Sequence, residues 1–193
     1  MDLEIRRLTP ELAEDYVRFF DVTPHDDSVD ENKCYCICWC GKDCEGEDFS
    51  TREKRREAAF RYVREDILQG YLAYLDGQPV GWCNANAKAD CLKCWSWRQF
   101  MKDVPAGEPE RIKSVFCFVV APQMQRKGVA SRLLEQVCSD AAREGFYSVE
   151  AYPNRSFVSV AMDFAGPIEL YRRNGFVPCF EFGNRLVVRK SLR

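Results

Sequence analysis

Residues 120–134 read VAPQMQRKGVASRLL and are the most informative part of this chain. They combine the end of an apolar strand, a short turn after Pro122, and a helix whose apolar face starts with Val129 and Leu133. The first N–H groups of a helix lack partners within the helix and carry partial positive charge. Because Gly128 also permits close backbone approach, the stretch predicts an anion site suited to a pyrophosphate.

This stretch forms a pair of motifs with residues 170–176. Gln125-Arg126-Lys127-Gly128-Val129-Ala130 fits the pattern Q/R-x-x-G-x-G/A and follows a strand that ends in Val-x-Pro. Residues 170–176 read LYRRNGF and fit LY-x-x-x-GF. In this order and at this distance, the two motifs resemble the GNAT superfamily of acetyl-CoA-dependent N-acetyltransferases. The resemblance covers nearly all of residues 3–192.

Patterns along the chain predict the order strand, two helices, hairpin, strand, helix, strand, helix, hairpin. We expect the second helix to begin at the capping box Ser50–Glu53 and to stop at Gly70, and the motif helix to span 125–144. The fold class is α/β, with a mixed, mostly antiparallel central sheet and helices on both faces. The GNAT resemblance implies the same fold, with a splayed pair of central strands in a single domain over 3–192.

Composition limits the classes of partner. The 193 residues carry a net charge of −2, so no overall basic field favours nucleic acid. No apolar run approaches the roughly 20 residues that cross a bilayer, and no signal peptide precedes the first strand. Eleven cysteines without an export signal suit a reducing compartment. We therefore expect a cytoplasmic protein without nucleic-acid or membrane partners.

The resemblance implies acetyl-CoA as the cofactor. Backbone N–H groups from Gln125 through Ala130 would hold its pyrophosphate. The pantetheine arm would pair with the central strand at Phe118, Val119 and Val120, where a backbone N–H would polarise the acetyl carbonyl. Many members of the family dimerise through C-terminal strands, so a homodimer is compatible with the resemblance.

The implied reaction is direct acetyl transfer to a primary amine through a tetrahedral intermediate. Tyr171 matches the family tyrosine near the CoA sulfur, and we predict that it is the general acid; packing is its alternative role. The central strand offers no carboxylate, so Glu150 on the next strand is the first candidate base. Asp90 and Asp163 follow, and loss of the proton to water is a further alternative. No metal is expected.

The long connections 21–50, 86–111 and 153–166 should build the acceptor pocket. Their aromatic side chains favour a small or medium amine. The segment 153–166 is longer than is typical of the family, and Phe164 and Pro167 stand where the family often has Asn and Ala. We therefore expect unusual CoA contacts there. His25, the only histidine, is expected at the surface.

The cysteine-rich segment 34–44 has cysteines at alternate positions from 34 to 40. Read as a strand, it would hold neighbouring thiols about 6.5–7 Å apart. That is too far for one zinc ion, whose sulfur ligands lie about 4 Å from one another. Convergence of Cys40 and Cys44 with Cys91 and Cys94 stays open as a zinc site.

Two other functions remain alternatives to an N-acetyltransferase. One is a CoA-binding sensor without turnover, and the other is a thiol- or zinc-responsive binding module on the same fold.

Overall fold

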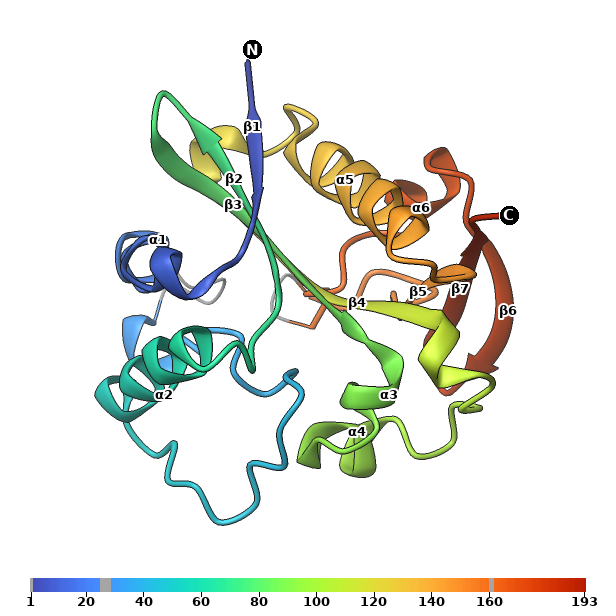
Figure 1. Cartoon of the computed structure of the whole chain (residues 1–193), viewed down its shortest axis with the longest axis horizontal. Helices are drawn as coiled ribbons and strands as arrows, with labels where there is room; N and C mark the ends of the chain where they lie inside the picture. Colours follow the sequence, from blue (N-terminus) through green and yellow to red (C-terminus); the bar gives the residue numbers. More distant parts are fainter. Residues whose placement is uncertain (1, 25–28, 160–161) are drawn as a thin grey trace.

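A computed structural model describes residues 2–24, 29–159 and 162–193, and His25 lies outside them. Within these ranges a seven-stranded sheet has the order β1-β2-β3-β4-β5-β7-β6 (Figure 1). All neighbouring strands are antiparallel except β4 and β5. The strands are β1 (Glu4–Arg7), β2 (Gly70–Leu75), β3 (Gln78–Ala87), β4 (Ile112–Val120), β5 (Ser148–Ala151), β6 (Val177–Phe182) and β7 (Arg185–Ser191).

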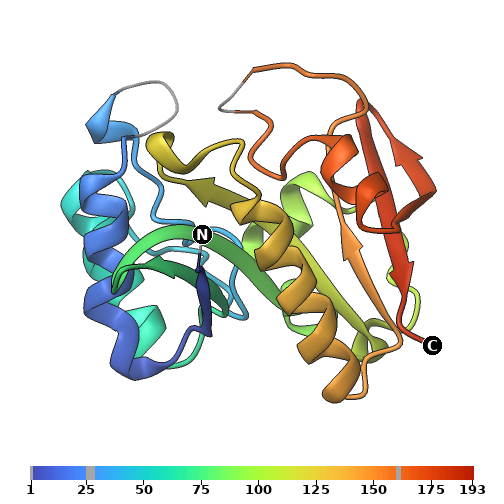
Figure 2. The same ribbon diagram turned by 90° about the horizontal axis from the view of Figure 1, so that it is seen from above.

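Helices cover both faces of this sheet. The helices α1 (Ala13–Val22) and α2 (Arg52–Arg64) lie on one face, and α5 (Val129–Arg143) and α6 (Ile168–Arg173) lie on the other (Figures 1 and 2). The short helices α3 (Lys88–Cys91) and α4 (Trp95–Phe100) precede β4. This arrangement confirms the predicted mixed α/β fold. None of the helices in the described part of the chain is long and apolar enough to span a membrane.

The two central strands separate part-way along their length. The parallel register of β4 and β5 runs from Ile112 opposite Ser148 to Val115 opposite Ala151 and ends there. Strand β4 continues to Val120, paired on its other side with β3. The predicted splay is therefore present, and it leaves the second half of β4 with one edge free of β5.

The motif helix α5 begins at Val129, so the expected start at 125 is wrong. Arg126 (φ 59°) and Gly128 (φ 83°) have left-handed backbones that interrupt a helix, and residues 125–128 form a turn instead. Beyond it, the predicted apolar face is buried against the sheet at Val129, Leu133, Val137 and Ala141.

Helix α2 begins as expected and ends early. The Thr51 side chain accepts a hydrogen bond from Lys54 N at 3.3 Å, which caps the first turn. The predicted stop at Gly70 is wrong because the helix ends at Arg64. Gly70 starts β2 instead, where a Cβ atom would lie 2.2 Å from Cys83 O. This glycine is needed for close strand packing rather than for ending a helix.

The cysteine-rich segment 34–44 consists of turns, so the expected strand is wrong. Tyr35 (φ 47°) and Cys36 (φ 51°) are consecutive left-handed residues, which turn the chain rather than extend it. The Tyr16 hydroxyl donates to Tyr35 O at 2.7 Å and the Tyr35 hydroxyl donates to Asp21 at 2.7 Å. Contacts with α1 therefore impose a conformation that the alternating sequence does not indicate.

Candidate functional site

Two pockets flank the free edge of β4. The first, the phosphate pocket, lies at the N-terminus of α5 and measures about 500 Å³. The turn preceding α5 supplies N–H groups that face outward at a helix N-terminus, an arrangement that binds anions. Its lining consists of Val120, Met124, Gln125, Arg126, Gly128, Val129, Ala130, Ser131, Pro167, Glu169, Leu170 and Arg173.

The phosphate pocket brings together most of the residues expected there. Lys127 is the one member of the hexapeptide 125–130 absent from its lining. Ser131 and Arg173 are lining residues that sequence reasoning missed. Arg173 lies two residues after Tyr171 within the second motif, so its position in the motif and its charge were the available signal. With Arg126, it adds positive charge where a phosphate would sit.

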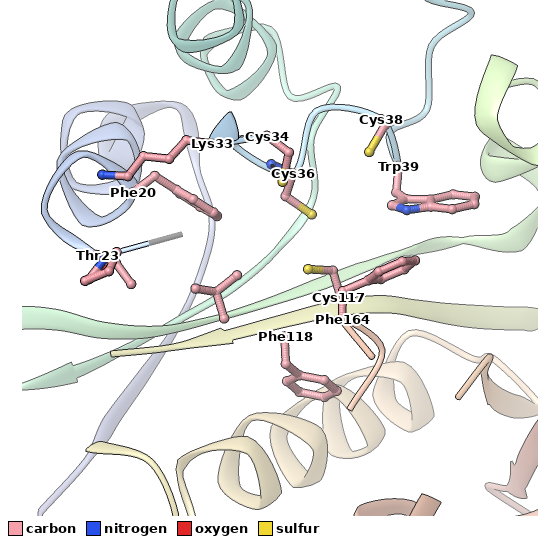
Figure 3. Close-up of a pocket in the computed structure, with 12 residues that line it drawn as sticks. Phe20, Thr23, Lys33, Cys34, Cys36, Cys38, Trp39, Cys117, Phe118 and Phe164 are labelled. Atoms are coloured by element: carbon pink, nitrogen blue, oxygen red, sulfur yellow. Dashed lines mark hydrogen bonds between the residues drawn. The ribbon is translucent and has the colours of Figure 1, made fainter. Parts of the chain in front are cut away.

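The second pocket, the thiol pocket, measures about 220 Å³ and lies on the α1 side of β4 (Figure 3). The segment 34–44 forms one wall and β4 forms the opposite one. Asp and Glu are absent from its described lining, which consists of Phe20, Thr23, Pro24, Lys33, Cys34, Cys36, Cys38, Trp39, Cys117, Phe118, Val119 and Phe164.

A short strap, residues 163–167, crosses the gap between the two pockets. Phe164 lines the thiol pocket and Pro167 lines the phosphate pocket. The Phe118 N–H, expected to polarise the acetyl carbonyl, donates to Phe164 O at 2.8 Å. The Tyr171 hydroxyl donates to Ala165 O. Carbonyl groups of the strap therefore already accept hydrogen bonds from the Phe118 N–H and the Tyr171 hydroxyl, the two donors that the predicted chemistry requires.

Tyr171 lies beneath this strap, fully buried on α6. Its ring centroid is 6.5 Å from that of Phe118 and 5.4 Å from that of Phe176. Burial raises the pKa of Tyr171 well above its ordinary value, with a further contribution from Cys83 and Cys117. The phenol therefore stays protonated at neutral pH, as a proton donor must.

Glu150 lies away from both pockets in a buried ion-pair network. Its Oε2 is 2.8 Å from Lys88 Nζ, with both side chains fully buried, and accepts from the Tyr152 hydroxyl at 3.2 Å. Its Oε1 accepts from Arg189 Nε at 2.9 Å. Lys88 Nζ also donates to Pro105 O at 2.7 Å. Both carboxylate oxygens are committed to this network, which favours a structural role.

The other two candidate bases are also engaged elsewhere. Asp90 pairs with Lys93 at 3.0 Å on the surface. Asp163 accepts from Val158 N at 2.8 Å and Asn154 Nδ2 at 2.9 Å, which holds the loop before the strap. Neither carboxylate lines the thiol pocket.

The description "Acetyltransferase (GNAT) family" belongs to the family model that matches residues 34–176. The chain belongs to the GNAT family. Its fold, with the splayed strands and the glycine-containing turn before α5, is the arrangement that the two motifs implied.

Solved GNAT structures share this fold along nearly the whole chain. The GNAT domain of PAT from S. lividans is 18% identical, with a TM-score of 0.60 over 98% of this chain and 90% of that chain. The paia N-acetyltransferase from Thermoplasma acidophilum in complex with coenzyme A is 16% identical, with a TM-score of 0.57 over 99% of each chain.

A third GNAT structure, yncA from Salmonella typhimurium with its cofactor acetyl-CoA, is 16% identical, with a TM-score of 0.54 over 99% of this chain and 94% of that chain. Among curated proteins, no match to this GNAT chain was found. At these identities, the likeness to solved structures describes the fold alone.

All eleven cysteines of this GNAT protein are free, and two outside the thiol pocket lie in contact with one another. Cys40 Sγ lies 3.5 Å from Cys44 Sγ. Arg98 of α4 pairs with Asp43 at 2.9 Å, so the segment 34–44 and the helix after Cys94 do meet. Over the ranges that the structure describes, no three His, Cys, Asp or Glu side chains are arranged to hold a metal ion.

Few of the aromatic residues in the long connections reach the thiol pocket. Trp39 lines it and stacks on Phe116, with ring centroids 4.5 Å apart. Trp97 is buried in the core, whereas Phe100 and Phe157 are exposed. Most of these aromatic side chains therefore do not contribute to the thiol pocket. Within the described residues, Trp39 and Phe164 are the rings from the long connections that line it.

The position of Glu150 predicts a large effect on stability. We expect Glu150→Gln to lower the free energy of unfolding by about 3–5 kcal/mol, because it leaves buried Lys88 without its counter-charge. Urea unfolding measures this difference. Glu4→Gln is the control, since the Glu4–Arg6 pair is exposed and screened by solvent and should contribute little to stability. Equal effects of the two substitutions would contradict a structural role for Glu150.

Proposed function

We propose that this GNAT protein transfers an acetyl group from acetyl-CoA to the primary amine of a small molecule. The observation that carries the proposal is the pair of pockets on either side of one gap in the sheet. One has the helix N-terminus and arginines that suit a pyrophosphate, and the other is small, largely apolar and borders the free edge of β4. A cofactor extended through the gap would join them.

The cofactor would be held largely by backbone groups. The turn and first helical residues from Gln125 through Ala130 suit the pyrophosphate, with Arg126 and Arg173 adding charge. The free edge of β4 at Phe118, Val119 and Val120 suits pairing with the amide groups of pantetheine. The family and the CoA-bound and acetyl-CoA-bound relatives support this assignment.

In the simplest form of the reaction, the amine attacks the thioester carbonyl directly. The Phe118 N–H would stabilise the oxyanion, and Tyr171 would donate its proton to the departing CoA sulfur. Burial raises the pKa of Tyr171, which keeps the hydroxyl protonated but also makes it a weaker acid, so the assignment rests on the place of Tyr171 in the second motif. In this direct form, the amine would arrive neutral or lose its proton to water, because the described lining of the thiol pocket contains no carboxylate.

The lining of the thiol pocket also indicates which class of acceptor amine it can bind. Ammonium groups in binding sites are usually held by carboxylates or by aromatic faces. Here the described lining offers thiols, aromatic and aliphatic groups, and the buried Lys33, whose Nζ donates to Asp21 O at 2.7 Å. We therefore propose a small acceptor with an apolar body rather than a polycation.

Gly128→Glu should abolish measurable binding of acetyl-CoA, because the φ of 83° disfavours any side chain and the new charge repels the pyrophosphate. Isothermal titration calorimetry with acetyl-CoA and CoA measures the loss. Gly145→Glu is the matched control, since Gly145 has a φ of 85°, equally open surroundings and a place at the other end of α5. Equal affinity for Gly128→Glu and wild type would refute the phosphate pocket.

The strap should release Phe118 when the cofactor binds. The Phe118 N–H cannot donate fully to both Phe164 O and an acetyl carbonyl, so the first bond must break or weaken. NMR with ¹⁵N-labelled phenylalanine should therefore show a shift of the Phe118 amide on addition of acetyl-CoA. An unchanged Phe118 signal at saturation would remove its assignment as the oxyanion donor.

Tyr171→Phe should lower kcat at least tenfold and change the affinity for acetyl-CoA little, because the hydroxyl is needed only as the sulfur departs. The assay uses an amine identified by screening and mass detection of the acetylated product. Phe176→Leu serves as a control for loss of packing around the Tyr171 ring. Wild-type kcat in Tyr171→Phe would reduce Tyr171 to a packing residue.

A further inference from the structure

Cys36 is a buried thiol at the centre of the thiol pocket. Its side chain is 1% exposed, and it lines the pocket together with Cys117, Phe118 and Val119 of β4. Figure 3 shows the Cys36 and Cys117 side chains pointing toward one another across the pocket, while Phe118 lies on the opposite side of β4. Cys36 therefore lies beside the part of β4 where the acetyl end of the cofactor is proposed to stop.

Hydrogen-bond donors surround the Cys36 sulfur. Asn84 Nδ2 lies 3.5 Å from Cys36 Sγ and also donates to Trp39 O at 2.7 Å. Asn84 is held in turn by Asn86, whose Nδ2 donates to Asn84 Oδ1 at 2.8 Å. These two asparagines are buried on β3, where a polar side chain without hydrogen-bond partners costs free energy.

The indole N–H of Trp82 is a second donor near the Cys36 sulfur. Trp82 is fully buried, and its Nε1 has no hydrogen-bond partner within the described part of the chain. Such orphan donors are rare in folded proteins. The neighbouring Cys117 thiol first, and then the nearby N–H groups of Trp82 and Asn84, lower the pKa of Cys36 despite its burial. An anionic Cys36 sulfur would give the orphan N–H the acceptor that it lacks.

The backbone at Cys36 has the strain that is typical of reactive positions. Tyr35 and Cys36 both adopt left-handed φ values, of 47° and 51°, although neither is glycine. Such conformations cost about 1–3 kcal/mol each and persist where surrounding contacts impose them, often at active sites. Here those contacts are the hydrogen bonds that Tyr35 makes with Tyr16 and Asp21.

Two other thiols of the pocket, Cys117 and Cys38, lack this activation. The hydrogen bond with Cys36, together with burial, raises the pKa of Cys117. Burial of its sulfur raises the pKa of Cys38. A thiolate is the nucleophilic form of cysteine, so the pocket distinguishes Cys36 from these two neighbours.

We propose that Cys36 takes the acetyl group from acetyl-CoA as a thioester before the amine receives it. The proposal rests on the proposed function, because acetyl-CoA is the donor. The Cys36 thiolate attacks the acetyl carbonyl, a new C–S bond forms and the C–S bond to CoA breaks. The departing CoA sulfur takes a proton from Tyr171, and the proton that Cys36 released on ionising restores the tyrosine. One thioester replaces another, so no oxidant, reductant or further reactant is needed.

The amine then attacks acetyl-Cys36. A C–N bond forms, the C–S bond to Cys36 breaks, and the proton lost by the nitrogen passes to the departing sulfur, which restores the thiol. The donors around Cys36 stabilise this sulfur as it leaves. Two successive acyl transfers thus replace the direct attack, and the sulfur acts as the base, since the described lining of the pocket contains no carboxylate.

The decisive experiment needs no acceptor amine. Wild-type protein in a phosphine reductant is incubated with acetyl-CoA, and intact-protein mass spectrometry and peptide mapping locate any acetyl group. In parallel, isotope exchange between acetyl-CoA and labelled free CoA is followed. We expect one acetyl group on Cys36, removable by neutral hydroxylamine, and exchange without amine.

Variants assign the exchange to one thiol. Cys36→Ser should lose at least 90% of the exchange rate and keep its affinity for acetyl-CoA by calorimetry and its thermal unfolding temperature. Cys36→Ala is the second variant in case serine disturbs the fold. Cys179→Ser, which changes an exposed thiol on β6 that lines neither pocket, should keep both acetylation of Cys36 and exchange.

Calorimetric measurement of acetyl-CoA binding distinguishes failure of the Cys36 step from failure of the proposed function. Wild-type protein that binds acetyl-CoA without acetylation of Cys36 or exchange would overturn the proposal and leave the proposed function standing. Acetylation of another cysteine, or exchange that survives Cys36→Ser, would overturn it equally. Wild-type protein that does not bind acetyl-CoA would remove the proposed function and the Cys36 step together.

Discussion

The parting of β4 from β5 beyond Val115 and Ala151 is the constraint on which the rest of the structure depends. Backbone N–H and C=O groups that lose a sheet partner must find another, because leaving them buried and unpaired is costly. The strap supplies one partner by placing Phe164 O against the Phe118 N–H. The same unpaired edge is what a pantetheine arm can use, so structural need and cofactor binding draw on the same backbone groups.

Where β4 and β5 are still paired, buried ion pairs link β5 to the neighbouring elements. Lys88, from the connection after β3, and Arg189 on β7 meet Glu150 on β5. A buried carboxylate without counter-charges would be strongly unfavourable, and here two cations and the Tyr152 hydroxyl compensate it. This network ties β5 to its neighbours where pairing with β4 is intact, which allows the strands to separate beyond it without loss of the sheet.

Two different electrostatic environments lie on either side of the gap. On the α5 side, backbone N–H groups and two arginines favour an anion. On the α1 side, the described lining has no carboxylate, and its thiols differ because the donors around Cys36 favour its charged form while burial disfavours charge on Cys38. The division suits a substrate whose charged part and reactive part are far apart, as they are in CoA thioesters.

Local patterns were enough to predict the order of elements, the fold and the buried face of α5, although the start of this helix was placed four residues too early. A buried stripe from Val129 to Ala141 depends on residues close together in the chain, so it can be read without a structure. The sequence did not indicate the turns at Cys36, the structural setting of Glu150, or the strap on Phe118. Each of these depends on partners between 14 and 62 residues away, which only tertiary packing brings into contact.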